Sequence, residues 1–128
     1  MQKLINAAMQ ARMESYSPYS GYSVGAAVLT ASGEIFSGCN IENASYGATM
    51  CAERTAIFSA VAAGHKNFTA IAIVGGKDGE ADLPYPCGMC RQVLSEFCDK
   101  DFKVIIARSE TDFEEYALGE LLPHSFLL

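Results

Sequence analysis

The chain has 128 residues, of which 50% are hydrophobic and 19% charged, and this composition excludes a disordered or low-complexity protein. Its net charge of −6 disfavours nucleic acid as a partner, because a phosphate backbone is also negative. No apolar run reaches the roughly 18 residues of a membrane span, so we expect no membrane partner. We expect residues 1–128 to form a single domain.

Helical and strand-like patterns alternate along the chain. Helical hydrophobic patterns cover residues 2–13, 51–63 and 88–98. Apolar, β-prone runs cover residues 24–30, 34–41, 69–74 and 102–107, and a weaker run covers 113–118. Ser32-Gly33 indicates a hairpin turn, and Gly64 is expected to end the second helix. This alternation predicts a central sheet covered by helices.

The chain contains five cysteines, and an odd number leaves one thiol unpaired in any full disulfide scheme. Residues 1–6 lack the apolar core of a signal peptide. We therefore expect a cytoplasmic protein with reduced thiols, since structural disulfides are rare in the cytosol. Reduced cysteines serve as small core residues, metal ligands or reactive thiols.

Two segments carry cysteines at the expected starts of helices. Cys51 opens the segment Cys-Ala-Glu-Arg, while Cys87 and Cys90 belong to the segment Pro-Cys-Gly-Met-Cys. A helix N-terminus presents free N–H groups and a positive dipole end, both of which favour the thiolate that ligates a metal. Three such thiolates suit a tetrahedral zinc ion with one open position.

The residues beside these cysteines favour a catalytic zinc site. A catalytic zinc binds water in its open position and lowers the pKa of that water to about 7. Glu53 is the candidate proton shuttle for that water, and Arg54 could donate to the sulfurs and offset their charge. Gln92 is a candidate to hydrogen-bond the site loop. The order Cys-x-Glu followed by Pro-Cys-x-x-Cys matches the zinc deaminase signature, with cysteine as the first ligand.

Three other interpretations of these residues remain open. Cys39 or Cys98 could close a structural zinc site as a fourth ligand, although a small buried thiol is the simpler role for both. A redox protein would cycle between Cys87 and Cys90 without a metal. Arg91 could form a structural ion pair or support the site.

Further segments accompany the zinc motifs, at residues 18–20, 24–27, 38–47, 90–93 and 122–126. With them the chain, from about Tyr16 to Phe126, resembles the three-cysteine cytidine deaminases of pyrimidine nucleoside salvage. The resemblance implies a three-layer α/β/α fold with a mixed five-stranded sheet and one zinc ion per chain. It implies hydrolytic deamination of cytidine and 2′-deoxycytidine to the uridines and ammonia, by zinc-activated hydroxide attack at C4 with Glu53 moving the protons.

The resemblance also implies which residues bind the nucleoside. Asn40 and Glu42 match an Asn-x-Glu motif that hydrogen-bonds the ribose 3′-hydroxyl. Tyr22 stands where the family usually has a Phe that packs on the pyrimidine. The backbone of Ala52 and the thiolate of Cys87 are implied to lie near the edge of the base.

Finally, the resemblance implies a homotetramer with its sites near subunit boundaries. Phe126 matches a tail aromatic that reaches a neighbouring subunit's site, and Tyr46 is expected at a subunit boundary. Other zinc deaminases, acting on blasticidin S or on nucleic acid, are the competing enzymes. The segment 40–45 favours the nucleoside enzyme, and a non-enzymatic zinc-stabilised module would release no ammonia.

Overall fold

A computed structural model describes residues 1–128. The elements in chain order are α1 (Gln2–Arg12), β1 (Tyr22–Thr30), β2 (Ile35–Cys39), the 3₁₀ helix η1 (Tyr46–Ala48), α2 (Ala52–Ala62), β3 (Phe68–Lys77), α3 (Gly88–Phe97), β4 (Lys103–Ala107), β5 (Phe113–Ala117) and α4 (Leu118–Leu121). Every predicted helix and strand is present, with ends shifted by a few residues. Leu118 is predicted to end the fifth strand, but in the structure it begins the short helix α4.

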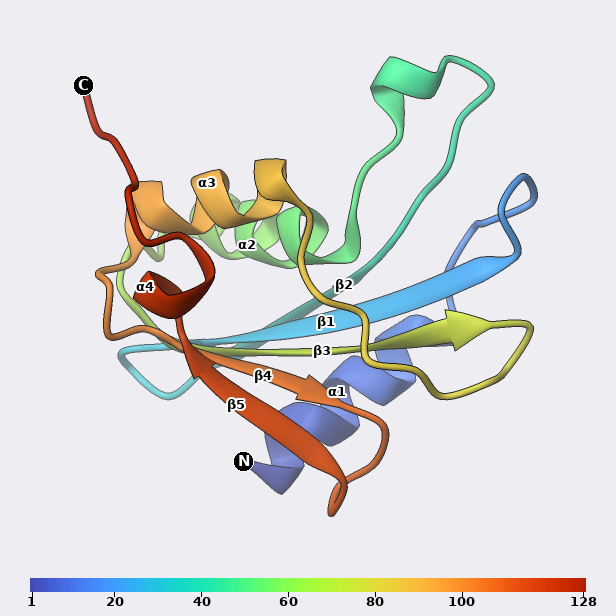
Figure 1. The fold of residues 1–128 in the computed structure, drawn as a ribbon, viewed down its shortest axis with the longest axis horizontal. Coiled ribbons are helices and arrows are strands. Elements are labelled where there is room, and N and C mark those ends of the chain that lie inside the picture. The colour runs from blue at the N-terminus through green and yellow to red at the C-terminus, as the bar shows by residue number, and fades with distance from the viewer.

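The strands form one mixed sheet in the order β2-β1-β3-β4-β5. β1 pairs antiparallel with both β2 and β3, β3 pairs parallel with β4, and β4 pairs antiparallel with β5. Helices α2 and α3 cover one face of this sheet and α1 covers the other, as Figure 1 shows. The three-layer α/β/α fold with a mixed five-stranded sheet is therefore confirmed.

Two glycines allow the helices to lie close to the sheet on its opposite faces. A Cβ on Gly25 of β1 would lie 2.1 Å from the Ala8 carbonyl oxygen of α1. A Cβ on Gly38 of β2 would lie 2.6 Å from the Ala56 backbone nitrogen of α2. Any side chain at these positions would push its helix away from the sheet.

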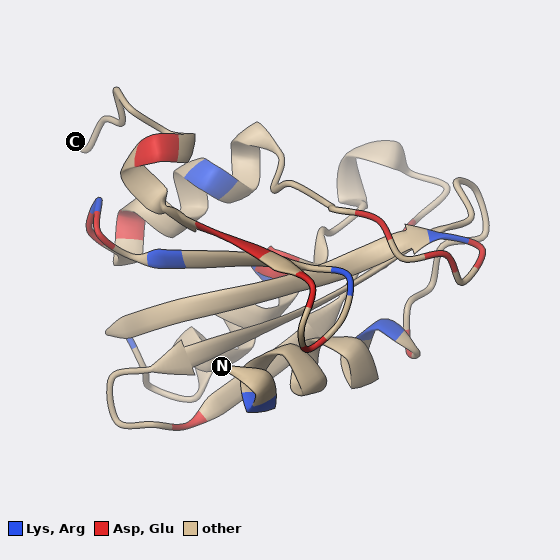
Figure 2. Ribbon diagram, turned by 60° about the horizontal axis from the view of Figure 1, so that its bottom comes forward, with Lys and Arg blue, Asp and Glu red and all other residues tan.

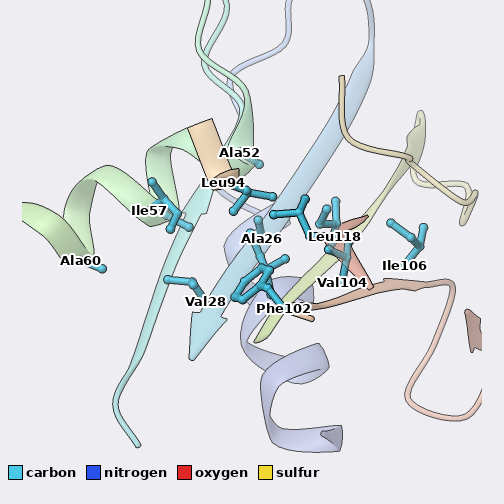
Figure 3. Close-up of a cluster of buried hydrophobic side chains, with 13 residues drawn as sticks. Ala26, Val28, Ala52, Ile57, Ala60, Leu94, Phe102, Val104, Ile106 and Leu118 are labelled. Atoms are coloured by element: carbon cyan, nitrogen blue, oxygen red, sulfur yellow. The ribbon is translucent and has the colours of Figure 1, made fainter. Parts of the chain in front are cut away.

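The core divides into two clusters, one on each face of the sheet. The cluster beneath α2 and α3 contains 13 buried residues, including Ile71, Ile73 and Ile106, and Figure 3 shows its side chains meeting between the helices and the sheet. The cluster beneath α1 contains 9 buried residues, including Ile5 and Ile105. Neighbouring residues of a strand point to opposite faces, so β3 and β4 supply both clusters.

Charge is distributed unevenly over the surface. Acidic residues cluster in the loop between β3 and α3, along β5 and in the turn before it, whereas Lys and Arg are scattered (Figure 2). No basic stripe follows any element. No helix is both long enough and apolar enough to cross a membrane.

Candidate active site

The two cysteine segments lie where the sequence predicts them, at the N-termini of α2 and α3. Cys51 and Cys87 are the N-cap residues of these helices, and both have extended backbones. Their carbonyl oxygens accept the first helical hydrogen bonds, from Thr55 N at 3.1 Å and from Arg91 N at 3.0 Å. Cys90 follows in the first turn of α3 and is fully buried.

The three sulfurs converge into one cluster whose spacing fits a zinc ion. Cys51 Sγ lies 3.8 Å from Cys87 Sγ, Cys87 Sγ lies 3.5 Å from Cys90 Sγ, and all three atoms lie within 4.8 Å of one another. Tetrahedral zinc–sulfur bonds of about 2.3 Å require sulfurs about 3.8 Å apart. No fourth His, Cys, Asp or Glu joins the group, so Cys39 and Cys98 do not close the site.

Arg54 gives the cluster a positive neighbour. Its Nη2 donates to Cys51 Sγ at 3.3 Å. Hydrogen bonds from Cys90 and then from Arg54 lower the pKa of Cys51 to about 5. The Arg54 side chain is buried, yet its Nε has no hydrogen-bond partner. A buried guanidinium with an unpartnered N–H needs nearby negative charge, and three metal-bound thiolates would supply it.

Glu53 is the one carboxylate held at the cluster. It is 5% exposed, and it forms no ion pair. Burial raises the pKa of Glu53 to about 7, because the apolar surroundings disfavour the charged carboxylate. A group with this pKa can both accept and release a proton near neutral pH, which is the requirement for a proton shuttle.

A pocket of about 440 Å³ opens above the cluster. Six residues that the sequence analysis singled out line it: Tyr22, Asn40, Cys51, Ala52, Glu53 and Cys87. The sequence analysis did not identify five further lining residues, namely Val24, Thr49, Met50, Pro84 and Tyr85. Val24 lies within the segment 24–27 noted above, and the other four are marked only by adjacency to a motif, since 49–50 precede Cys51 and 84–85 precede the Pro-Cys segment.

Asn40 organises the β1 side of this pocket. Its Oδ1 accepts hydrogen bonds from Ser15 Oγ at 2.5 Å and Val24 N at 2.9 Å. Its Nδ2 donates to the Tyr22 carbonyl at 2.8 Å, which leaves one N–H of the amide available to a ligand. At Tyr22, burial and then the nearby carboxylate of Asp82 raise the pKa of the hydroxyl.

Five predicted site residues are not part of this pocket lining: Cys90 and Arg54, which belong to the sulfur cluster and its surroundings, and Glu42, Phe126 and Gln92. Glu42 Oε1 accepts hydrogen bonds from Tyr19 N at 2.9 Å and Ser20 N at 3.1 Å. Phe126 is 65% exposed in the tail. Gln92 Nε2 donates to the Phe126 carbonyl at 3.2 Å, so this side chain contacts the tail.

Arg91 is the residue that braces the site loop. Its Nε donates to the Pro86 carbonyl at 2.7 Å, and its Nη1 donates to the Leu121 carbonyl at 2.7 Å. It forms no ion pair. Arg91 therefore ties the backbone beside Cys87 to the end of α4.

A second and larger cavity, of about 640 Å³, lies beside α1. Its polar lining includes Asn6, Gln10, Arg12 and Arg108, but it contains no cysteine, histidine or carboxylate. It offers no ligand set for a metal and no general base. The smaller pocket above the three sulfurs is therefore the candidate active site.

An α/β/α fold with three cysteine sulfurs at two helix N-termini, a buried carboxylate and a pocket beside them fits a zinc enzyme. Comparison with known proteins narrows this class. The family model described as the cytidine and deoxycytidylate deaminase zinc-binding region matches residues 1–106. The chain therefore belongs to this family of zinc-dependent deaminases.

Individual relatives extend the similarity to nearly the whole chain. A cytidine deaminase of Halalkalibacterium halodurans is 49% identical over 125 residues, which cover 98% of this chain and 92% of that protein. The crystal structure of a cytidine deaminase from Burkholderia pseudomallei has a TM-score of 0.87 and 48% identity, covering 97% of both chains. A blasticidin-S deaminase of Bacillus cereus is 41% identical over 87 residues, 64% of this chain and 62% of that protein.

Proposed function

We propose that residues 1–128 form a single cytidine deaminase domain that converts cytidine and 2′-deoxycytidine, with water, to uridine and 2′-deoxyuridine plus ammonia. The observation that carries this proposal is the open three-sulfur cluster with a buried carboxylate beside it. A structural zinc site is usually closed by a fourth ligand and has no use for such a carboxylate. The similarity to named cytidine deaminases supports the choice of substrate.

The zinc ion, when bound by Cys51, Cys87 and Cys90, supplies the Lewis acidity that makes water a nucleophile near neutral pH. Glu53 accepts a proton from the attacking water and delivers it to N3 of the ring, which makes C4 electrophilic. After the C4–O bond forms, Glu53 carries the proton of the new C4 hydroxyl group to the amino group. The C4–N bond then breaks, and ammonia leaves.

Side chains and backbone groups at the site can bind both the base and the sugar of a nucleoside. Tyr22 offers a ring face to the pyrimidine, while the Ala52 backbone and Cys87 border the base edge. Asn40 has an N–H free for a ribose hydroxyl, and the second oxygen of Glu42 can accept from the same sugar. The pocket volume of about 440 Å³ lies within the range of small-molecule sites.

The assembly in this proposal is a cytoplasmic homotetramer. Tyr46 is 80% exposed, Phe126 65% and Leu127 64%, and a monomer rarely leaves several large apolar side chains in water. Subunit contact would cover them and would bring Phe126 to a neighbour's site. Sedimentation of the full chain and of a chain truncated before Phe126 tests this, and a tetramer unaffected by truncation would contradict the role of the tail.

One assay tests the function. The purified protein is given cytidine, 2′-deoxycytidine, cytosine, CMP and blasticidin S in turn, and the loss of ultraviolet absorbance is followed. We expect turnover of the two nucleosides. Turnover of blasticidin S alone would favour the activity named for the Bacillus cereus relative. Zinc-loaded protein that leaves cytidine unchanged would overturn the proposal.

A further inference from the structure

A cluster of three side chains joins the site loop to the edge strand of the sheet. The Tyr85 hydroxyl donates to Glu114 Oε1 at 2.6 Å, and the Tyr116 hydroxyl donates to the same oxygen at 2.8 Å. The rings of Tyr85 and Tyr116 meet edge to face, with centroids 6.2 Å apart and an interplanar angle of 68°. Hydrogen bonds of this length to an ionised carboxylate are among the stronger ones in proteins.

Besides the bond from Arg91 to the Pro86 carbonyl, the loop that carries Tyr85 has few attachments to the rest of the chain. Pro84 and Pro86 flank the tyrosine, and neither has an N–H to donate. Both prolines are buried, whereas Tyr85 is 47% exposed. The Tyr85 amide itself donates only to the nearby Leu83 carbonyl, at 3.0 Å. The hydroxyl of Tyr85 therefore provides the link from this segment to β5.

Glu114 faces the layer that contains the active site. It lies opposite Ile106, which belongs to the core cluster beneath α2 and α3. The next residue, Glu115, lies opposite Ile105, which belongs to the cluster beneath α1. Glu115 pairs instead with Lys103, at 3.7 Å. The chain thus offers two adjacent carboxylates on opposite faces of one strand.

We propose that Glu114 is a positioning residue for the substrate pocket. By holding the Tyr85 hydroxyl, it keeps in place the segment that supplies Pro84, Tyr85 and Cys87 to the pocket lining. Glu114 itself touches neither the sulfurs nor the pocket. A zinc ion, when bound, would hold Cys87 independently, so Glu114 acts on the substrate wall of the pocket. This inference rests on the proposed function, in which that pocket binds the nucleoside.

The test compares Glu114→Ala with Glu115→Ala as its matched control. We expect Glu114→Ala to raise KM for cytidine about threefold to tenfold, because substrate binding must then order the loose segment. We expect kcat to change less than KM, and zinc per chain to stay at the wild-type value. Tyr85→Phe should reproduce this effect, and Tyr116→Phe, which keeps the Tyr85 bond, should not.

Two further measurements separate positioning from a general loss of structure. Glu114→Gln retains an oxygen that accepts a phenol hydrogen, so it should restore KM toward wild type. Hydrogen exchange of the peptide spanning residues 83–91 should quicken in Glu114→Ala and Tyr85→Phe but not in Glu115→Ala. Equal KM values for the Glu114 and Glu115 variants, or loss of zinc with KM unchanged, would overturn the inference. Failure of the wild-type protein to deaminate cytidine would instead overturn the proposed function.

Discussion

The two cavities of this molecule differ in chemistry more than in size. The cavity beside α1 is the larger, at about 640 Å³, but it contains no group that could bind a metal or move a proton. The cavity above the sulfurs has about 440 Å³ and holds two of the three thiols and a buried carboxylate in its lining. Convergence of reactive groups at two helix N-termini, rather than volume, therefore identifies the active site.

One arginine in each of these two regions shows the same difference in chemistry. Arg12 at the end of α1 is held by protein groups, since Nε donates to Ser23 Oγ at 2.8 Å and Nη2 donates to the Glu80 carbonyl at 2.6 Å. Arg54 at the sulfurs keeps an Nε without a partner. The first arginine fastens a loop, whereas the second leaves hydrogen-bonding capacity for a metal-bound state. Polar groups left unpartnered in a buried place are a sign of function.

The largest effect expected from a single substitution is loss of the metal. Cys90→Ser replaces a buried ligand sulfur, so bound zinc should fall to a small fraction of one per chain and deamination to background. Cys98→Ser changes a thiol near the end of the same helix that is not part of the cluster, and it should keep zinc and activity. Elemental analysis after gel filtration measures both. Equal zinc contents in the two variants would contradict the ligand assignment.

Glu53→Gln should give the next largest effect. It keeps the size of the side chain but removes the proton shuttle, so kcat should fall by about 10³-fold while zinc stays bound. Gln10→Ala in the larger cavity should leave kcat within about twofold. Steady-state kinetics on zinc-matched samples compares the two. A Glu53→Gln enzyme that retains substantial turnover would remove the shuttle from the mechanism.

Stability against pH tests the buried state of Glu53 in zinc-free protein. Burial raises its pKa from 4.5 in the unfolded chain to about 7 in the folded one. As pH rises through this window, the unfolded chain loses the proton first, so the free energy of unfolding should fall. Relative to Glu53→Gln, the wild type should lose up to about 3 kcal/mol, measured by urea denaturation. A difference that does not vary with pH would show that Glu53 titrates normally.

Substitutions of the two arginines should affect different properties: Arg54→Ala the zinc affinity, and Arg12→Ala the free energy of unfolding. Arg54→Ala should weaken zinc binding by about 10- to 100-fold, because it removes the positive neighbour of the thiolates. Arg12→Ala should leave zinc affinity unchanged and lower the free energy of unfolding by about 1–3 kcal/mol through its lost hydrogen bonds. Competition with a zinc chelator and thermal unfolding measure the two effects. The reverse assignment of effects would contradict the contrast between the two regions.

Much of the fold follows from local sequence patterns, since hydrophobic periodicity is a property of neighbouring residues. It locates β3 from its continuous apolar run, and Gly64, with a φ of 98°, ends α2 as predicted. Periodicity does not establish that β1 lies between β2 and β3, because strand order depends on packing between distant segments. The short helix α4 was missed, and its N-terminus is held by Glu120 Oε1, which accepts from Ala117 N at 2.8 Å.

The active site likewise contains some residues that local sequence predicts and others that only the fold brings together. The three cysteines, Glu53 and Arg54 follow from spacing within two short segments. Thr49, Met50 and Tyr85 become pocket walls only because the topology brings their loops together. His65 shows the same limit, since its contacts with Glu34, at 2.7 Å, and with Phe36 join residues that are far apart in the sequence.

Zinc titration of the wild-type protein tests the central claim most directly. The metal is removed with a chelator, returned in measured steps, and cytidine deamination is recorded at each zinc content. The open three-sulfur site predicts activity that rises in proportion to zinc and reaches its maximum at one ion per chain. Full deamination by the zinc-free protein, or a fully zinc-loaded protein without activity, would contradict it.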